Sequence, residues 1–187
     1  MRRDWLNLPN VITLLRIAAV PMFLAVLFAE PEKSSPWRWL AVLLFVAAIA
    51  TDGVDGAIAR KRNLVTDLGK LLDPIADKVL LGGALIALSV LDEVHWAFTI
   101  LILVREIALT VYRMLVLRDR VVAANAGGKA KTIMQGITVG FLLSPLDLYW
   151  PPLATLELAA LILTTVVTLV TGAQYLLAAR RSSSVSS

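Results

Sequence analysis

Long apolar stretches alternate with short polar ones along almost the whole chain. Six such stretches can be drawn, at roughly 11–29, 39–58, 71–91, 94–117, 132–149 and 152–178. A helix needs about 20 residues to cross a bilayer, and each stretch is close to that length. The pattern therefore predicts an all-α integral membrane protein with six transmembrane helices.

Composition also favours the membrane class over the soluble one. Hydrophobic residues make up 58% of the 187 residues and charged residues only 17%, whereas charged residues are about a quarter of an ordinary soluble domain. We expect one membrane domain over residues 1–181 and a disordered Ser-rich tail at 182–187. The short apolar and basic segment before the first stretch is expected to lie along the membrane interface.

The distribution of basic residues predicts the orientation in the membrane. Lys and Arg gather before the first stretch, between the second and third, between the fourth and fifth, and after the sixth. Positive residues favour the cytoplasmic side, so both termini are predicted to be cytoplasmic. Five aromatic residues should then form an interfacial belt on the opposite side: Trp37, Trp39, Trp96, Tyr149 and Trp150. Because this topology accounts for the net charge of +4, membrane lipids and phosphorylated substrates are expected partners, and nucleic acid is not.

Four aspartates among the apolar stretches are the strongest candidates for chemistry. Asp52 and Asp55 are three residues apart and Asp73 and Asp77 are four apart, so each pair shares one face of a helix. Two such helices placed face to face would bring four carboxylates together, where cations must offset their repulsion. An all-oxygen ligand set favours Mg²⁺, Mn²⁺ or Ca²⁺. The chain has no Cys, which excludes thiolate nucleophiles and Cys-based metal sites.

The aspartates belong to a longer pattern, Asp-x2-Asp-Gly-x2-Ala-Arg-x8-Gly-x3-Asp-x3-Asp, that resembles the signature of the CDP-alcohol phosphotransferases. Its fixed positions are filled by Asp52, Asp55, Gly56, Ala59, Arg60, Gly69, Asp73 and Asp77. The resemblance implies two divalent cations, Mg²⁺ or Mn²⁺, held by the four aspartates, with Asp77 also acting as the general base. It further implies that an acceptor hydroxyl attacks the phosphorus bearing the diacylglycerol, releasing CMP, and that the protein is a homodimer. The implied contacts to the CDP-linked lipid are Asn10, Thr13, Gly56, Arg60, Thr66 and Gly69.

Basic residues in the fourth apolar stretch and directly before the fifth predict a second phosphate site. Arg105 and Arg113 are eight residues apart, about two helical turns, and therefore share a face. Lys129 and Lys131 precede the fifth stretch and add positive charge. An arginine within a membrane helix needs a partner or an aqueous cavity. The alternative is that Arg105 and the neighbouring Glu106 simply pair with each other.

The sequences around these basic residues resemble those of bacterial phosphatidylglycerophosphate synthases, a branch of the same family. That resemblance implies CDP-diacylglycerol as donor, sn-glycerol 3-phosphate as acceptor, and a multi-pass protein of the bacterial inner (plasma) membrane with a cytoplasmic active site. Two alternatives stay open. The same chemistry can use another acceptor, as in a cardiolipin synthase of the CDP-alcohol type or a phosphatidylinositol-phosphate synthase. A divalent-cation transporter is the more remote alternative. Transport sites usually lie at the membrane midplane, whereas the four aspartates fall at the predicted cytoplasmic ends of the second and third stretches.

Gly136 and Gly140 form a Gly-x3-Gly pair in the fifth stretch. Such pairs let membrane helices approach closely, either within one protein or across a dimer interface. We favour packing within the protein.

Overall fold

The computed structural model describes the backbone of residues 8–61, 67–116 and 126–184, and the side chains of 14–51, 75–76, 78–112, 131–175 and 177. Every regular element in these ranges is a helix, which confirms the all-α prediction. The elements are α1 (Leu8–Ala29), α2 (Pro36–Lys61), α3 (Asp67–Val90), α4 (Trp96–Val116), α5 (Ala126–Leu143), α6 (Leu146–Tyr149) and α7 (Pro152–Ser184). The expected interfacial segment at 1–7 lies outside the described residues. Helix α7 continues to Ser184, three residues into the stretch expected to be a disordered tail.

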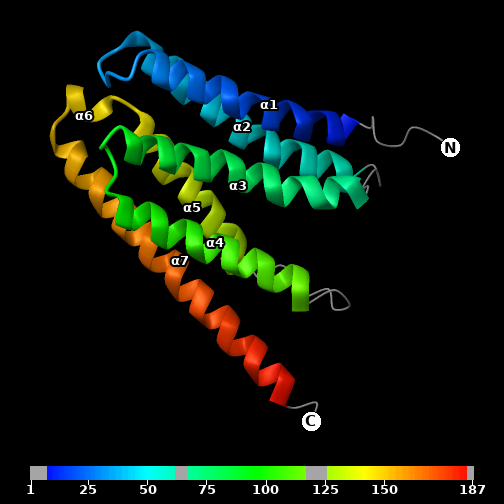
Figure 1. Ribbon diagram of the computed structural model, residues 1–187. Helices are drawn as coiled ribbons and strands as arrows, with labels where there is room; N and C mark the ends of the chain where they lie inside the picture. The colour runs from blue at the N-terminus through cyan, green and yellow to red at the C-terminus, as the bar shows by residue number, and fades with distance from the viewer. Residues whose placement is uncertain (1–7, 62–66, 117–125, 185–187) are drawn as a thin grey trace.

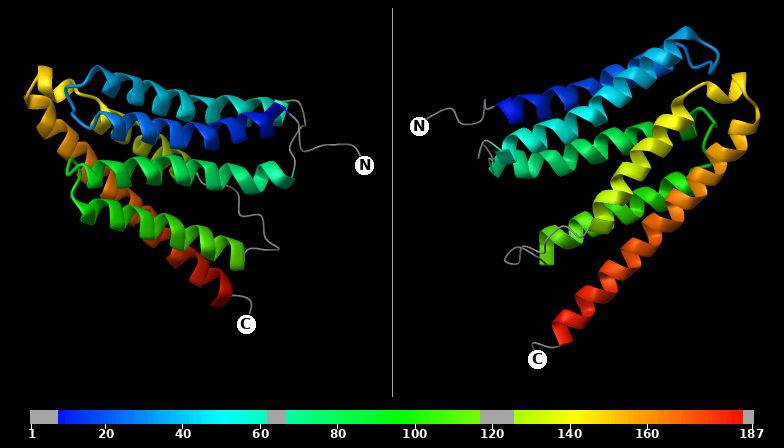
Figure 2. Two further views of the ribbon diagram at one scale, coloured as in Figure 1. Left: turned by 45° about the horizontal axis from the view of Figure 1, so that its top comes forward. Right: turned by 180° about the vertical axis from the view of Figure 1, so that it is seen from behind.

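The six long helices form a bundle in which successive helices run in opposite directions (Figure 1). One end of the bundle, here called the α6 end, carries the α1–α2 and α3–α4 connections and α6. The other, the motif end, carries the start of α1, the end of α2 and the start of α3. Helix α1 packs against α2 and α3, whereas α7 runs obliquely across α4 and α5 (Figure 2).

The bundle exposes apolar side chains and buries polar ones. Leu43, Val104 and Ile137 are each more than 60% exposed. Buried positions include Arg16 and Gln135. A soluble bundle would show the reverse distribution, because water favours polar groups outside. Lipid tails are the surroundings that such a surface suits, so the protein is embedded in a membrane.

Length and composition identify one described stretch, Pro152–Tyr175, as both long and apolar enough to cross a bilayer. Shorter apolar stretches lie in α1, α2, α3 and α5. These whole helices have 22, 26, 24 and 18 residues, and the shortest of them is about 27 Å long at 1.5 Å per residue. That length is close to the thickness of the hydrocarbon core. The number of crossings and their orientation stay predictions.

The fifth apolar stretch, expected to be one helix over 132–149, is divided in the structure. Helix α5 ends at Leu143 and the separate short helix α6 begins at Leu146. Pro145 explains the break, because proline has no amide hydrogen and disfavours a helical conformation in the residue before it. Ser144 closes the end of α5, since both its amide and its hydroxyl donate to the carbonyl of Phe141, at 3.0 and 2.7 Å.

Gly136 and Gly140 pack within the protein, as expected. A Cβ atom added to Gly136 would lie 3.1 Å from Cδ1 of Ile49 in α2, and one added to Gly140 would lie 3.7 Å from the ring of Phe45. The two glycines therefore let α5 approach α2 closely.

Ion pairs tie the connections together at the α6 end. Arg38, fully buried at the start of α2, pairs with Glu93 and donates from Nε to the carbonyl of Leu143 at 2.8 Å. Lys33 lies 2.8 Å from Asp147 and 3.4 Å from Glu157. These contacts join the start of α2 to the α3–α4 connection and to the end of α5, and join the α1–α2 connection to α6 and α7.

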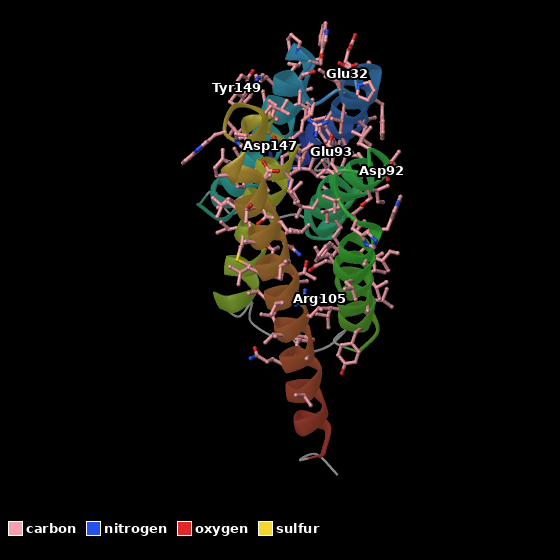
Figure 3. The ribbon with its side chains drawn as sticks, turned by 90° about the vertical axis from the view of Figure 1, so that its left-hand side faces the viewer. Glu32, Asp92, Glu93, Arg105, Asp147 and Tyr149 are labelled. Atoms are coloured by element: carbon pink, nitrogen blue, oxygen red, sulfur yellow. The ribbon has the colours of Figure 1, made fainter. Side chains whose placement is uncertain are left out.

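The predicted aromatic belt gathers at this same end. Its five members are all exposed: Trp37, Trp39, Trp96, Tyr149 and Trp150. Tyr149 and Asp147 are both on α6, and Glu93 and Asp92 lie close to the same end (Figure 3). Amphipathic rings on an exposed rim suit the region where lipid head groups meet water.

Arg38→Ala is expected to lower the stability of the fold without changing substrate affinity. The substitution leaves Glu93 and the Leu143 carbonyl without their buried partner, and each lost charge-assisted hydrogen bond costs about 1.5–3 kcal/mol. A lowered midpoint of thermal unfolding in detergent would show this. Glu32→Ala, at an exposed position in the same region, is the control and should change the midpoint little. An unchanged midpoint for Arg38→Ala would contradict the proposed importance of this pair.

Candidate functional site

The signature residues lie on two adjacent helices at the motif end. Asp52 and Asp55 are in the second half of α2, and Asp73 and Asp77 are in the first half of α3. The end of α2 and the start of α3 lie side by side in the three views of the ribbon (Figures 1 and 2). The backbone thus brings the two halves of the signature to one region of the bundle.

The other residues predicted to contact the CDP-linked lipid are placed in the same way. Gly56 and Arg60 follow Asp55 on α2, Gly69 opens α3, and Asn10 and Thr13 are in the first turns of α1. Helix α1 packs against both motif helices. Thr66 lies outside the described residues, as do the side chains of Asn10, Thr13, Arg60 and the four aspartates.

The donor set of the signature fits a site for hard divalent cations. It consists of four carboxylates and no nitrogen or sulfur ligand, and such a set suits Mg²⁺ or Mn²⁺. Among the side chains that the structure describes, no other group of three or more His, Asp or Glu is placed to hold a metal. The candidate metal site therefore rests on the chemistry of the four aspartates and on the position of their helices.

A second group of charged residues is described in full and lies between α3, α4, α5 and α7. Glu106 of α4 accepts hydrogen bonds from Lys78 of α3 at 3.0 Å and from Arg105 at 2.8 Å, and it pairs with Lys131 of α5. Arg105 also donates from Nη2 to the hydroxyl of Thr171 in α7 at 2.9 Å. We call Lys78, Arg105, Glu106 and Lys131 the Glu106 cluster.

The Glu106 cluster retains positive charge. The Arg105–Glu106 pair is present, as the alternative interpretation of the sequence expected. However, Lys78 and Lys131 share the same carboxylate, and one carboxylate cannot neutralise three cations. The side chains of Lys131 and Arg105 are only 6% and 14% exposed, so bulk water screens them weakly. Such a group attracts a dianion such as a phosphate monoester.

Of the four basic residues predicted to bind a second phosphate, the structure brings Arg105 and Lys131 together at Glu106. Arg113 is on α4 and Lys129 is on α5, but their side chains lie outside the described residues. Arg113 is two turns beyond Arg105 toward the motif end of the bundle.

Two buried or half-buried cations were not identified from the sequence. Lys78 follows Asp77 directly on α3 and links the signature helix to the Glu106 cluster. Arg16 of α1 is only 2% exposed. The signal for Arg16 was present, since it is a single charge in a long apolar stretch, and such charges usually serve a function.

Comparison with known proteins agrees with the family that the aspartate signature indicates. A family model described as CDP-alcohol phosphatidyltransferase matches residues 6–173. The chain is 44% identical over 162 residues to a probable phosphatidylglycerophosphate synthase of Mycobacterium tuberculosis, covering 87% of this chain and 78% of the relative. It is 44% identical over 174 residues to the CDP-diacylglycerol–glycerol-3-phosphate 3-phosphatidyltransferase of Bacillus subtilis, covering 86% and 90%. A Rickettsia bellii protein of the same name is 41% identical over 137 residues, covering 73% and 74%.

Proposed function

Because the chain belongs to the CDP-alcohol phosphatidyltransferase family, we propose that it transfers the phosphatidyl group of CDP-diacylglycerol to sn-glycerol 3-phosphate. The products are phosphatidylglycerophosphate and CMP. The family match over most of the chain, with every fixed position of the signature filled, carries the proposal. The choice of acceptor is supported by the names of the relatives and by the positive charge of the Glu106 cluster.

The four aspartates are proposed to hold two divalent cations, Mg²⁺ or Mn²⁺. When bound, such ions neutralise bridging phosphates and stabilise charge on the attacking and leaving oxygens. Asp77 is also proposed to accept the proton of the acceptor hydroxyl. That hydroxyl oxygen forms a bond to the phosphorus bearing the diacylglycerol, and the bond from this phosphorus to the CMP oxygen breaks.

The CDP-linked lipid is proposed to bind across α1, α2 and α3. Glycines at Gly56 and Gly69 leave room for a ligand to approach the backbone, and Arg60 can hold phosphate with two parallel hydrogen bonds. The full proposed set is Asn10, Thr13, Gly56, Arg60, Thr66 and Gly69. The acceptor phosphate is proposed to bind Arg105, Arg113, Lys129 and Lys131.

Release of CMP from CDP-diacylglycerol by the purified protein tests the reaction and its acceptor together. The panel of acceptors is sn-glycerol 3-phosphate, glycerol, phosphatidylglycerol and inositol phosphate. We expect sn-glycerol 3-phosphate to be used best, and glycerol poorly because it lacks the phosphate. A preference for phosphatidylglycerol or inositol phosphate would replace the proposed acceptor. Mn²⁺ flux into sealed vesicles without CMP release would favour the transporter alternative.

Lys131→Ala is expected to raise the apparent KM for sn-glycerol 3-phosphate about tenfold or more, because a charge-assisted hydrogen bond contributes about 1.5–3 kcal/mol. The apparent KM for CDP-diacylglycerol should stay nearly unchanged. We expect the same of Arg113→Ala and Lys129→Ala. Lys33→Ala is the matched control, since it removes a lysine from the ion pairs of the α6 end. Equal rises in both KM values would contradict a specific role in acceptor binding.

We also propose that the protein crosses the bacterial plasma membrane six times as a homodimer, with both termini and the motif end in the cytoplasm. Because the chain has no Cys, single cysteines report sidedness directly. In intact cells, an impermeant maleimide is expected to label Ser34→Cys, in the α1–α2 connection, and to leave Ser186→Cys unlabelled until the membrane is opened. The opposite labelling pattern would invert the proposed orientation. Light scattering of the detergent-solubilised protein tests the dimer.

A further inference from the structure

Gly172 leaves a gap in the surface of α7 where this helix crosses α4, here called the notch, and the side chain of Arg105 lies in it. Figure 3 labels Arg105 beside α7. Gly172 is buried at this point. A Cβ atom added to Gly172 would lie 2.8 Å from Nε of Arg105 and 3.1 Å from its Cγ. Both distances are shorter than an ordinary contact of about 3.5 Å. A larger residue at this position would therefore force the Arg105 side chain to move.

Thr171 holds the guanidinium at the edge of the same notch. Its hydroxyl donates to the carbonyl of Val167 at 2.7 Å, which directs a lone pair of Oγ1 toward another donor. Nη2 of Arg105 donates to this oxygen at 2.9 Å, while Nη1 donates to Glu106 at 2.8 Å. Contacts from two helices thus fix the plane of the guanidinium, beside the other cations of the Glu106 cluster.

The guanidinium still has donors to offer. Arginine carries five N–H donors in a rigid fork. The buried Nε packs against Gly172, whereas Nη1 and Nη2 each carry a second N–H besides the one that donates to Glu106 or Thr171. Thr171 is uncharged, so its contact orients Arg105 without neutralising it, whereas a carboxylate in its place would remove the charge that attracts phosphate. The notch supplies orientation and leaves the positive charge available.

We infer that Gly172 and Thr171 are positioning residues that set the orientation of Arg105 for the acceptor phosphate. The inference rests on the proposed function, in which Arg105 binds that phosphate. It assigns α7 a part in acceptor recognition, although neither residue belongs to the signature of α2 and α3. The orientation of Arg105 should matter for the reaction, since a misplacement of a substrate-positioning group by about 1 Å can lower the catalytic rate about 10²-fold.

Gly172→Ala tests the inference with a small perturbation. The clash falls on the flexible part of an arginine side chain, so the fold should tolerate it and the guanidinium should move. We expect the apparent KM for sn-glycerol 3-phosphate to rise about tenfold or more, with that for CDP-diacylglycerol and the thermal midpoint nearly unchanged. Gly140→Ala is the matched control, because its added Cβ would meet the ring of Phe45 at an ordinary 3.7 Å.

Two further comparisons separate positioning from simple packing. On an Arg105→Ala background, Gly172→Ala should cause no additional rise in the acceptor KM, because it acts through Arg105. Thr171→Val removes the acceptor of the 2.9 Å hydrogen bond and should raise the acceptor KM, whereas Thr171→Ser keeps the hydroxyl and should not.

An additional rise on the Arg105→Ala background would overturn the inference, as would a wild-type acceptor KM in Gly172→Ala. The wild-type protein assayed beside these variants tests the proposed function separately. If it uses sn-glycerol 3-phosphate and the variants behave as wild type, only the inference fails. If it releases CMP only with acceptors that have no phosphate, the proposed acceptor fails and the inference fails with it.

Discussion

Asp73→Asn is expected to abolish CMP release while the helical bundle stays folded, and Asp52→Asn should do the same. Each substitution replaces a charged oxygen with a neutral amide in the site proposed to hold two divalent cations. The loss should be large, because these cations stabilise the charge that develops on the attacking and leaving oxygens. EDTA should likewise abolish activity in the unmodified protein, and Mg²⁺ or Mn²⁺ should restore it. CMP release with and without added metal is the measurement.

Asp92→Asn is the matched control for the loss of one carboxylate. Asp92 is exposed at the α6 end, and its backbone has a positive φ of 57°. Asparagine tolerates this left-handed conformation well, so the substitution should alter neither the fold nor the activity. Elution of each variant from a size-exclusion column as a single peak would show that the bundle is intact. Full activity of the wild-type protein in EDTA would exclude the proposed metal mechanism.

The helices were largely predictable from the sequence because membrane helices are continuous apolar segments of defined length. Most expected boundaries lie within a few residues of those in the structure. The division of the fifth stretch at Ser144 and Pro145 was missed. Apolar residues continue on both sides of the break, so the hydropathy pattern shows a single stretch. The helix ends there because Pro145 has no amide hydrogen to donate to the preceding turn.

Of the candidate site, the aspartate signature could be predicted from the sequence and the contacts of the Glu106 cluster could not. The aspartate signature is visible in the sequence because its partners are close in the chain and follow helical spacing. The contacts of Glu106 with Lys78 and Lys131 span 28 and 25 residues, and that of Arg105 with Thr171 spans 66. Spacing does not determine which helices meet, since that depends on how their whole surfaces pack. Gly172 has no feature in the sequence that separates it from the other glycines, and only its distance from Arg105 identifies it.

The Glu106 cluster also bears on the choice between acceptors. The cluster has more positive charge than Glu106 can neutralise, so an acceptor with a phosphate gains charge-assisted hydrogen bonds there that an acceptor without one cannot make. Glycerol should therefore be discriminated against more strongly than a phosphorylated alcohol of a different shape. Inositol phosphate shares the phosphate, so the cluster alone does not separate it from glycerol 3-phosphate. The names of the relatives favour glycerol 3-phosphate.

Asp77→Asn is expected to separate binding of CDP-diacylglycerol from the chemical step. In the proposed mechanism Asp77 is both a metal ligand and the group that accepts the proton of the attacking hydroxyl. Asparagine keeps an oxygen that can face a cation but is not a base. Binding of CDP-diacylglycerol should therefore remain largely intact, while the rate of the chemical step falls about 10²-fold or more.

Single-turnover release of CMP from protein saturated with both substrates measures the rate of the chemical step. Equilibrium binding of CDP-diacylglycerol to the same variant measures its affinity for the donor. Asp73→Asn, assayed alongside, should lose activity through weakened metal binding, since Asp73 is proposed to act as a ligand alone. The informative quantity is thus the difference between the two variants rather than either loss by itself. If Asp77→Asn lost binding and turnover together, Asp77 would be a metal ligand only. The proton would then have to pass to another group, and the carboxylates of Asp52 and Asp55 on the facing helix would be the next residues to test.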